Sequence, residues 1–144
     1  MKKTNIIITF ILLLLTGSCS NVQNEYSSNK CYFVFENSNH NNSRLAEAMT
    51  AYSGVFCTVS LISKNGAQYY AFTNNSGLTE KTILTDLDKQ RTHILGLNNG
   101  LIIGYGKLSD PLTFYAYDLE CPNCFDPDAI PVRSKKLSIS TSGI

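Results

Sequence analysis

The 144-residue sequence predicts an all-β domain of small antiparallel sheets, arranged as a sandwich or a small barrel. From Cys31 onward, short apolar runs of strand length alternate with clusters of Asn, Gly and Ser, which favour turns. Sustained helical spacing of apolar residues occurs in one segment. We therefore expect one short helix beside the sheets.

The first elements of the domain are a strand, a helix and a second strand. Cys31–Phe35 is apolar and aromatic, a composition typical of a strand. Ser43 is placed to cap a helix over Arg44–Tyr52, and Gly54 is placed to end it. The strand pattern resumes at Val55–Ile62.

The pair Asn65-Gly66 predicts a two-residue hairpin turn, because both central positions of a type I′ turn need a positive φ. This turn joins Val55–Ile62 to the aromatic strand Ala67–Phe72. The following stretch, Leu78–His93, is mostly polar. It predicts no more than one loose helical turn.

Four further strands are predicted, two on each side of a Cys-Pro-Asn-Cys turn. Leu101–Tyr105 and Leu112–Tyr117 precede the turn. Ile130–Val132 and Leu137–Thr141 follow it and are shorter.

The N-terminal residues have the pattern of an export signal. Lys2 and Lys3 give a basic start, Ile6–Leu15 is an apolar run, and small residues then precede Cys19. The run is too short for a permanent membrane helix, which needs about 20 apolar residues.

The stretch Leu15–Cys19 resembles a bacterial lipobox. The resemblance implies diacylglycerol on the Cys19 thiol and cleavage before it; the alternative is an ordinary secretory signal that ends at a cysteine. We expect a signal peptide over residues 1–18, a lipidated polar tether over residues 19–30, and a domain over residues 31–144. The expected location is the bacterial cell envelope, facing the periplasm or the cell surface, and the membrane is contacted through the lipid anchor.

The charge balance gives no electrostatic reason to expect nucleic acid or anionic lipid as a partner, and nucleic-acid binding is set aside. Without Lys2 and Lys3, 10 of the 12 basic residues remain against 11 acidic ones, and no run of like charge occurs. The sequence also lacks a Ser/His/Asp constellation, a phosphate-binding glycine loop and a metalloprotease motif. We therefore expect a non-enzymatic protein.

Cys121 and Cys124 form the strongest chemical motif in the chain. Two thiols spaced C-x-x-C on a tight turn can chelate one metal ion or form a redox disulfide. A metal site of this type normally takes four protein ligands. Only 20 residues follow Cys124, and they contain no Cys or His. The sequence thus holds half of such a site.

Leu101–Gly106 and Phe114–Cys124 together resemble the Rieske-type domain family, especially small lipoproteins of gut Bacteroidetes. The resemblance implies stacked small antiparallel sheets with a cluster-binding loop at one tip. The family's first loop reads C-x-H, but Asn123 stands where the histidine would be. An asparagine amide nitrogen has no lone pair for iron, so a Rieske 2Fe–2S cluster is not expected.

Cys121 and Cys124 suit one half of a zinc or iron site, and the second pair of ligands is not contained in this sequence. The resemblance implies that the second loop and the closing strands are absent, which would leave an open sheet edge and low stability. Two alternatives stay open: a cofactor-free envelope scaffold or binding module, and a thiol–disulfide or 2Fe–2S electron-transfer protein.

The remaining candidate ligands have structural explanations. Cys31 and Cys57 lie in apolar runs, so they are buried small side chains or one disulfide; a metal site completed by Cys31, Cys57, Cys121 and Cys124 is a further alternative. His40 and His93 lie in polar surroundings and are expected to be solvated or hydrogen-bonded. We expect Asp118 to fix the turn before Cys121 rather than act as an acid or base.

Overall fold

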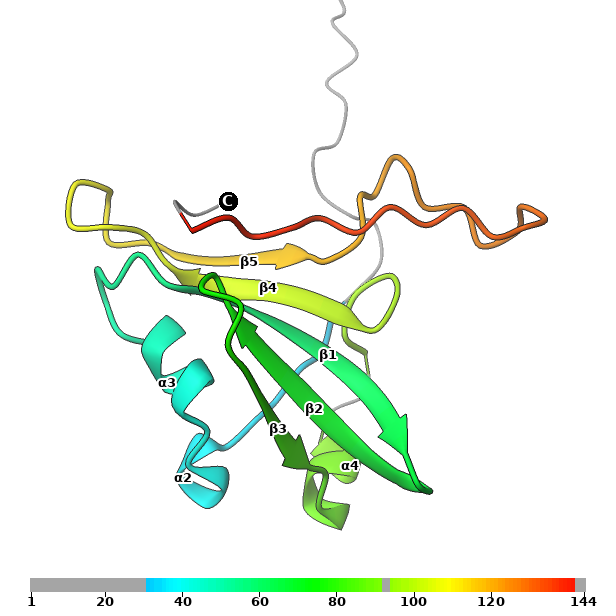
Figure 1. The fold of residues 1–144 in the computed structure, drawn as a ribbon, viewed down its shortest axis with the longest axis horizontal. Coiled ribbons are helices and arrows are strands. Elements are labelled where there is room, and N and C mark those ends of the chain that lie inside the picture. The colour runs from blue at the N-terminus through cyan, green and yellow to red at the C-terminus, as the bar shows by residue number, and fades with distance from the viewer. Residues whose placement is uncertain (1–30, 92–93, 142–144) are drawn as a thin grey trace, which may run out of the picture.

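The computed structural model describes residues 31–91 and 94–141. The strands form one open antiparallel sheet of five strands in the order β3-β2-β1-β4-β5 (Figure 1). The all-β class is therefore confirmed. The strands are β1 (Phe56–Lys64), β2 (Ala67–Asn74), β3 (Thr79–Ile83), β4 (Gly100–Tyr105) and β5 (Phe114–Asp118).

The β1–β2 hairpin forms where the sequence predicts it. Asn65 and Gly66 have φ angles of 52° and 76°, as a type I′ turn requires. Lys64 pairs with Ala67 next to the turn, and the pairing continues to Cys57 opposite Asn74. Both strands extend two residues beyond their predicted ends, to Lys64 and Asn74.

The helix α3 (Ser43–Ala48) is shorter than predicted and begins with a different cap. Asn42, not Ser43, is the capping residue, since its side chain accepts a hydrogen bond from the Leu45 N–H at 2.9 Å. The predicted last turn is lost because Tyr52 has a φ of 60°. A second short helix, α2 (Asn37–His40), lies in a segment without any apolar repeat.

The polar stretch after β2 is more regular than predicted. It contains β3, which pairs with β2 along its whole length, and α4 (Asp86–Arg91). Thr85 and Asp88 fix the start of α4, because Asp88 Oδ2 accepts hydrogen bonds from the Thr85 N–H at 2.8 Å and from the Thr85 hydroxyl at 2.7 Å. His93 lies outside the described residues.

Three predicted strands are not strands in the structure. Cys31–Phe35 is extended but makes only a single bridge, from Tyr32 to Ile94. Ile130–Val132 and Leu137–Thr141 make no ladder either. The side chains of Ile130–Val132 and Leu137–Thr141 are mostly exposed, so burial against a sheet does not hold these two segments in register.

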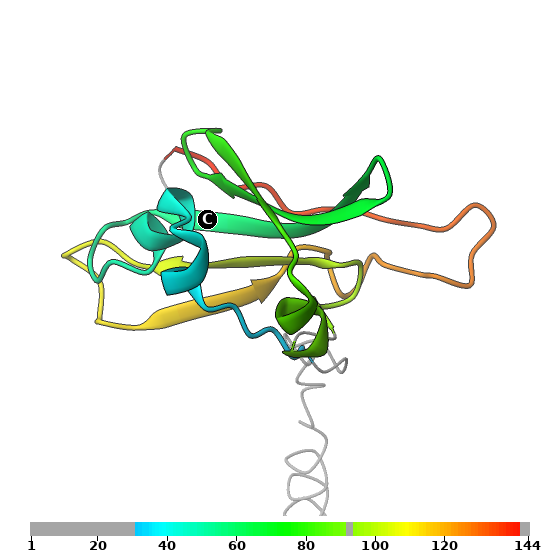
Figure 2. The ribbon, with the colours of Figure 1, turned by 90° about the horizontal axis from the view of Figure 1, so that it is seen from below.

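The main core covers one face of the sheet. Phe33 and Phe35, from the N-terminal segment, meet the ring of Tyr70 edge to face, with centroids 5.4 Å and 5.8 Å away. The helix α3 adds Leu45 and Ala48 to this layer (Figure 2). The strands contribute Cys57, Val59, Tyr70, Phe72, Leu101 and Ile103.

The opposite face carries a smaller cluster. It consists of Phe56, Ile102 and Leu119, and Ile139 from the C-terminal segment packs against it. This face is therefore covered partly by chain that follows the Cys-Pro-Asn-Cys turn. In residues 31–91 and 94–141, no helix has the length and apolar character needed to cross a membrane.

Candidate functional site at the Cys121–Cys124 turn

Cys121 and Cys124 are joined in a disulfide, with their Cα atoms 5.2 Å apart. The turn between them is tight, because the N–H groups of Cys124 and Phe125 both donate to the Cys121 carbonyl, at 2.9 Å and 3.0 Å. Pro122 and Asn123 are exposed at its outer side. The two predicted site residues are thus brought together, in the oxidised form.

A buried carboxylate lies directly before the turn. Glu120 is 1% exposed and accepts three hydrogen bonds: from Asn98 Nδ2 at 2.8 Å, from the Ser134 hydroxyl at 2.7 Å and from the Lys135 N–H at 2.9 Å. Burial alone would raise the pKa of Glu120, but these donors outweigh it and hold the pKa below its ordinary value. Glu120 therefore ties the turn to two other loops as a stable anion.

Asp118 fixes the approach to the turn, as predicted. Its Oδ1 accepts the Glu120 N–H at 3.0 Å, and its Oδ2 accepts the Leu97 N–H at 2.8 Å. Gly96 allows this second contact, since a Cβ atom there would lie 2.6 Å from Asp118 Oδ2, and its φ is +70°.

The disulfide lies within an irregular hairpin over residues 119–137, here called the C-terminal hairpin. At its base, the Leu137 N–H donates to the Leu119 carbonyl at 2.7 Å. Farther out, Asp126 and Arg133 exchange two backbone hydrogen bonds of 3.0 Å and 3.1 Å. Their side chains also form an ion pair of 2.6 Å. The hairpin projects beyond the sheet in both views (Figures 1 and 2).

The other two described cysteines are free and do not pair with each other. Cys31 is exposed, and its thiol donates to the Ile94 carbonyl at 3.3 Å. Cys57 is fully buried in the core, where burial raises the pKa of its thiol to about 12. Within residues 31–91 and 94–141, no three His, Cys, Asp or Glu side chains are grouped as metal ligands would be. Because both thiols are free, Cys31 and Cys57 do not form the disulfide that the sequence allows.

His40 is hydrogen-bonded, as predicted, and its partner is Asp88. Nε2 of His40 lies 3.0 Å from Asp88 Oδ2, and each side chain is only 8% exposed. The His40 ring stacks on Phe35 with centroids 4.7 Å apart. Burial would raise the pKa of Asp88, but the hydrogen bonds from Thr85 and His40 hold it below its ordinary value. The Thr85-x-x-Asp88 spacing is a local signal for the helix start, but nothing local in the sequence pairs Asp88 with His40.

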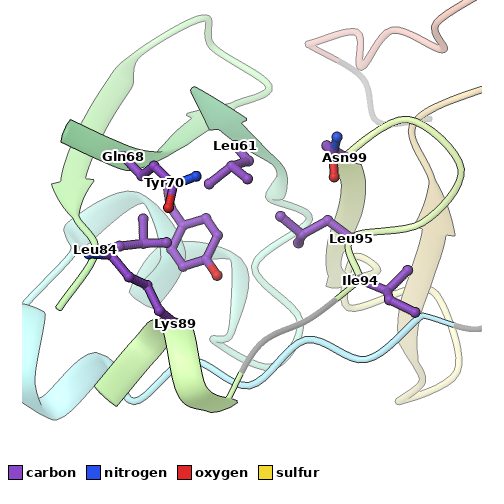
Figure 3. Close-up of a pocket in the computed structure, with 8 residues that line it drawn as sticks. All are labelled: Leu61, Gln68, Tyr70, Leu84, Lys89, Ile94, Leu95 and Asn99. Atoms are coloured by element: carbon purple, nitrogen blue, oxygen red, sulfur yellow. The ribbon is translucent and has the colours of Figure 1, made fainter. Parts of the chain in front are cut away.

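A separate pocket of about 170 Å³ opens beside β1, β2 and α4 (Figure 3). The Tyr70 ring lies at its centre, between Leu84 and Leu95 (Figure 3). Lys89 is at the rim, where its ammonium group lies 3.3 Å from Asp86 Oδ1. The volume suits a group about the size of benzene. The pocket is lined by Leu61, Gln68, Tyr70, Leu84, Lys89, Ile94, Leu95 and Asn99.

The turn can act chemically in two states. In the disulfide, neither sulfur is a thiolate, and thiolates are what zinc and iron bind. Two-electron reduction would give two thiols on one turn. Cys19, the predicted lipidation site, lies outside the described residues. Comparison of the chain with protein-family models, with curated proteins and with solved structures finds no match.

Proposed function

We propose that this chain is a lipid-anchored protein of the bacterial cell envelope, and that its β domain is a non-enzymatic binding module. The Cys121–Cys124 disulfide carries the proposal, since such bonds persist in exported proteins and not in the reducing cytosol. In this role the disulfide is structural, because it closes the Cys121–Cys124 turn within the C-terminal hairpin. The Leu15–Cys19 stretch supports the anchor.

The contacts around the turn support a structural role for the disulfide. The Cys121 N–H donates to the Lys135 carbonyl at 2.9 Å, so the turn also holds the returning half of the hairpin. Glu120 holds Ser134 and Lys135 from the neighbouring position. Closing a four-residue loop adds about 2 kcal/mol to the free energy of unfolding in the chain-entropy model.

Metabolic labelling tests the anchor. Cells that express the full chain are fed an alkyne-bearing fatty acid, and we expect the label on the mature protein. Cys19→Ala should abolish the label, whereas Cys31→Ala, which removes an exposed thiol of the domain, should keep it. A labelled Cys19→Ala variant would contradict the lipobox assignment.

Thiol mapping tests the disulfide separately from the anchor. Envelope protein is alkylated before and after reduction, and its peptides are analysed by mass spectrometry. We expect Cys121 and Cys124 to react only after reduction, while exposed Cys31 reacts before it. Complete alkylation of Cys121 and Cys124 without reductant would refute a structural disulfide.

A second candidate function is metal binding by the reduced turn. The two sulfurs are adjacent on a surface turn, which is the arrangement that zinc and iron sites use for one half of their ligands. The proposed similarity to Rieske-type domains supports metal binding as well, since it rests on the segments Leu101–Gly106 and Phe114–Cys124, and the second of these contains β5 and the turn itself. Two further ligands would have to come from outside the described residues.

Cobalt(II) binding tests this candidate. The reduced full chain should bind about one equivalent, with the charge-transfer absorption that thiolate ligands produce. Cys124→Ser should reduce that absorption, and Cys57→Ser should leave it unchanged, because Cys57 is buried in the core. Equal absorption in all three proteins would exclude the turn as the metal site.

A further inference from the structure

The tip of the C-terminal hairpin is apolar and fully exposed. Ile130 is 101% exposed and Val132 is 57% exposed, and Pro131 between them is also at the surface. The tip lies at the far end of the projecting hairpin (Figure 1). Because the hairpin projects beyond the sheet, its tip can offer these side chains to a partner.

Basic side chains follow this tip along the returning half of the hairpin. Arg133 is neutralised by its ion pair with Asp126. Lys135 and Lys136 are exposed, and neither forms an ion pair within the described residues. Exposed Asp128 is the one acidic group at the tip without an ion pair in the part of the chain that the structure describes. Of these two cations, Lys136 also interacts electrostatically with the buried carboxylate of Glu120 near the base of the hairpin.

We propose that the hairpin tip docks into the interfacial layer of a phospholipid bilayer. Ile130 and Val132 enter the edge of the acyl-chain region, and Lys135 and Lys136 contact anionic headgroups behind them. Exposed apolar side chains followed by lysines are the combination that interfacial binding uses. A fluid interface accepts a projecting tip without shape complementarity, which favours lipid over a protein pocket.

The position of the hairpin agrees with the proposed anchor. Cys31, the first described residue, contacts Ile94, and the same loop contacts Asp118 through the Leu97 N–H. The tether therefore joins the domain at the end of the sheet from which the hairpin projects. Twelve tether residues reach at most about 40 Å, so the proposed anchor would keep Cys31 within that distance of the bilayer. This inference rests on the proposed lipid anchor, because the anchor would give the hairpin tip a high local concentration of lipid.

A single tryptophan reports whether the tip enters the bilayer. The chain contains no Trp, so Ile130→Trp in the lipidated full-length protein gives an unambiguous fluorescence signal. The protein is reconstituted in vesicles of phosphatidylethanolamine and phosphatidylglycerol, with and without lipids that carry a nitroxide on the acyl chain. The matched control is Leu108→Trp, at a site that is 80% exposed in the loop between β4 and β5.

We expect the tryptophan at position 130 to shift its emission to the blue and to be quenched by the nitroxide lipid. The tryptophan at position 108 should show neither change. Adding Lys135→Gln and Lys136→Gln should lower the ratio of inserted to free tip by roughly fivefold for each lysine removed. The two substitutions should have little effect in vesicles without anionic lipid.

Two results would overturn the proposal. One is equal quenching at positions 130 and 108, or none at position 130. The other is a blue shift at position 130 in native envelope membranes but not in vesicles of the same lipids, which would assign the tip to a protein partner. Fatty-acid labelling of the same sample distinguishes a failure of this proposal from a failure of the anchor. If the protein carries no label, the lipid anchor is absent; if it carries the label and the tryptophan at position 130 is not quenched, the tip does not enter the bilayer.

Discussion

The buried carboxylate of Glu120 connects its own turn with two other segments, one at Asn98 and one at Ser134 and Lys135. It receives donors from Asn98, Ser134 and Lys135, and its own N–H is bound by Asp118. From the sequence alone, Glu120 was only a charged neighbour of a cysteine. Its role depends on long-range contacts, which no local pattern encodes.

Glu120→Gln should destabilise the fold at pH 7. The amide cannot accept from all three donors, since its nitrogen would face either the Lys135 N–H or the Asn98 amide. We expect a loss of about 2 kcal/mol in the free energy of unfolding, measured with urea. Asp128→Asn, which changes an exposed carboxyl on the same hairpin, should have an effect near zero.

The same substitution should change the pH dependence of stability. Because the pKa of Glu120 is lower in the folded state than its unfolded value of about 4.3, its contribution is complete above that value. The contribution is lost as the pH falls through the folded pKa. The difference in unfolding free energy between wild type and Glu120→Gln should therefore shrink on acidification from pH 6. A constant difference down to pH 2 would contradict this assignment.

At the level of elements, the predictions succeeded where local chemistry decides the structure. The Asn65-Gly66 turn was predictable because positive φ at two successive positions strongly restricts the residue types. The strand β3 was missed because its sequence, Thr-Glu-Lys-Thr-Ile, is polar, as suits the edge of a sheet. Ile130–Val132 was assigned to a strand from its β-branched residues, but no neighbouring strand covers it.

The start of α3 can be tested by mutation, because the sequence predicts Ser43 as the capping residue and the structure has Asn42. Asn42 is fully buried, and besides capping Leu45 it donates to the Thr82 hydroxyl at 2.9 Å. Asn42→Ala should cost about 2 to 3 kcal/mol in unfolding free energy, because it leaves both partners without their bonds. Ser43→Ala, at the predicted cap, removes only an exposed bond to Glu80 and should cost less than about 1 kcal/mol. Equal losses would refute the assignment of Asn42 as the cap.

In the whole molecule, the two faces of the sheet are covered unequally. One face carries the main core beneath α3 and the N-terminal segment. The other has only a small cluster, to which Ile139 contributes from outside the sheet. The sequence predicted a layered β fold through its strands, but it could not predict that an irregular segment would serve as a covering layer.

Ile139→Asp should release that covering segment. Its side chain packs on the cluster of Phe56, Ile102 and Leu119, so a charge there removes apolar burial worth about 2 kcal/mol. We expect a lower midpoint in urea and increased binding of a hydrophobic dye to the native protein. Ser138→Asp, at the exposed neighbouring position, should change neither. No difference between the two variants would show that the segment does not cover this face.

The strand order has a consequence for how the chain folds as it is synthesised. The strands β1, β2 and β3 are neighbours both in sequence and in the sheet, so they can assemble as soon as they emerge. The strand β4 then joins β1 on the side opposite β2. Until it arrives, β1 is an open edge whose backbone N–H and C=O groups at Phe56–Ser60 lack the partners that β4 later supplies. For that interval the nascent chain is a substrate for chaperones and for mispairing with other β strands.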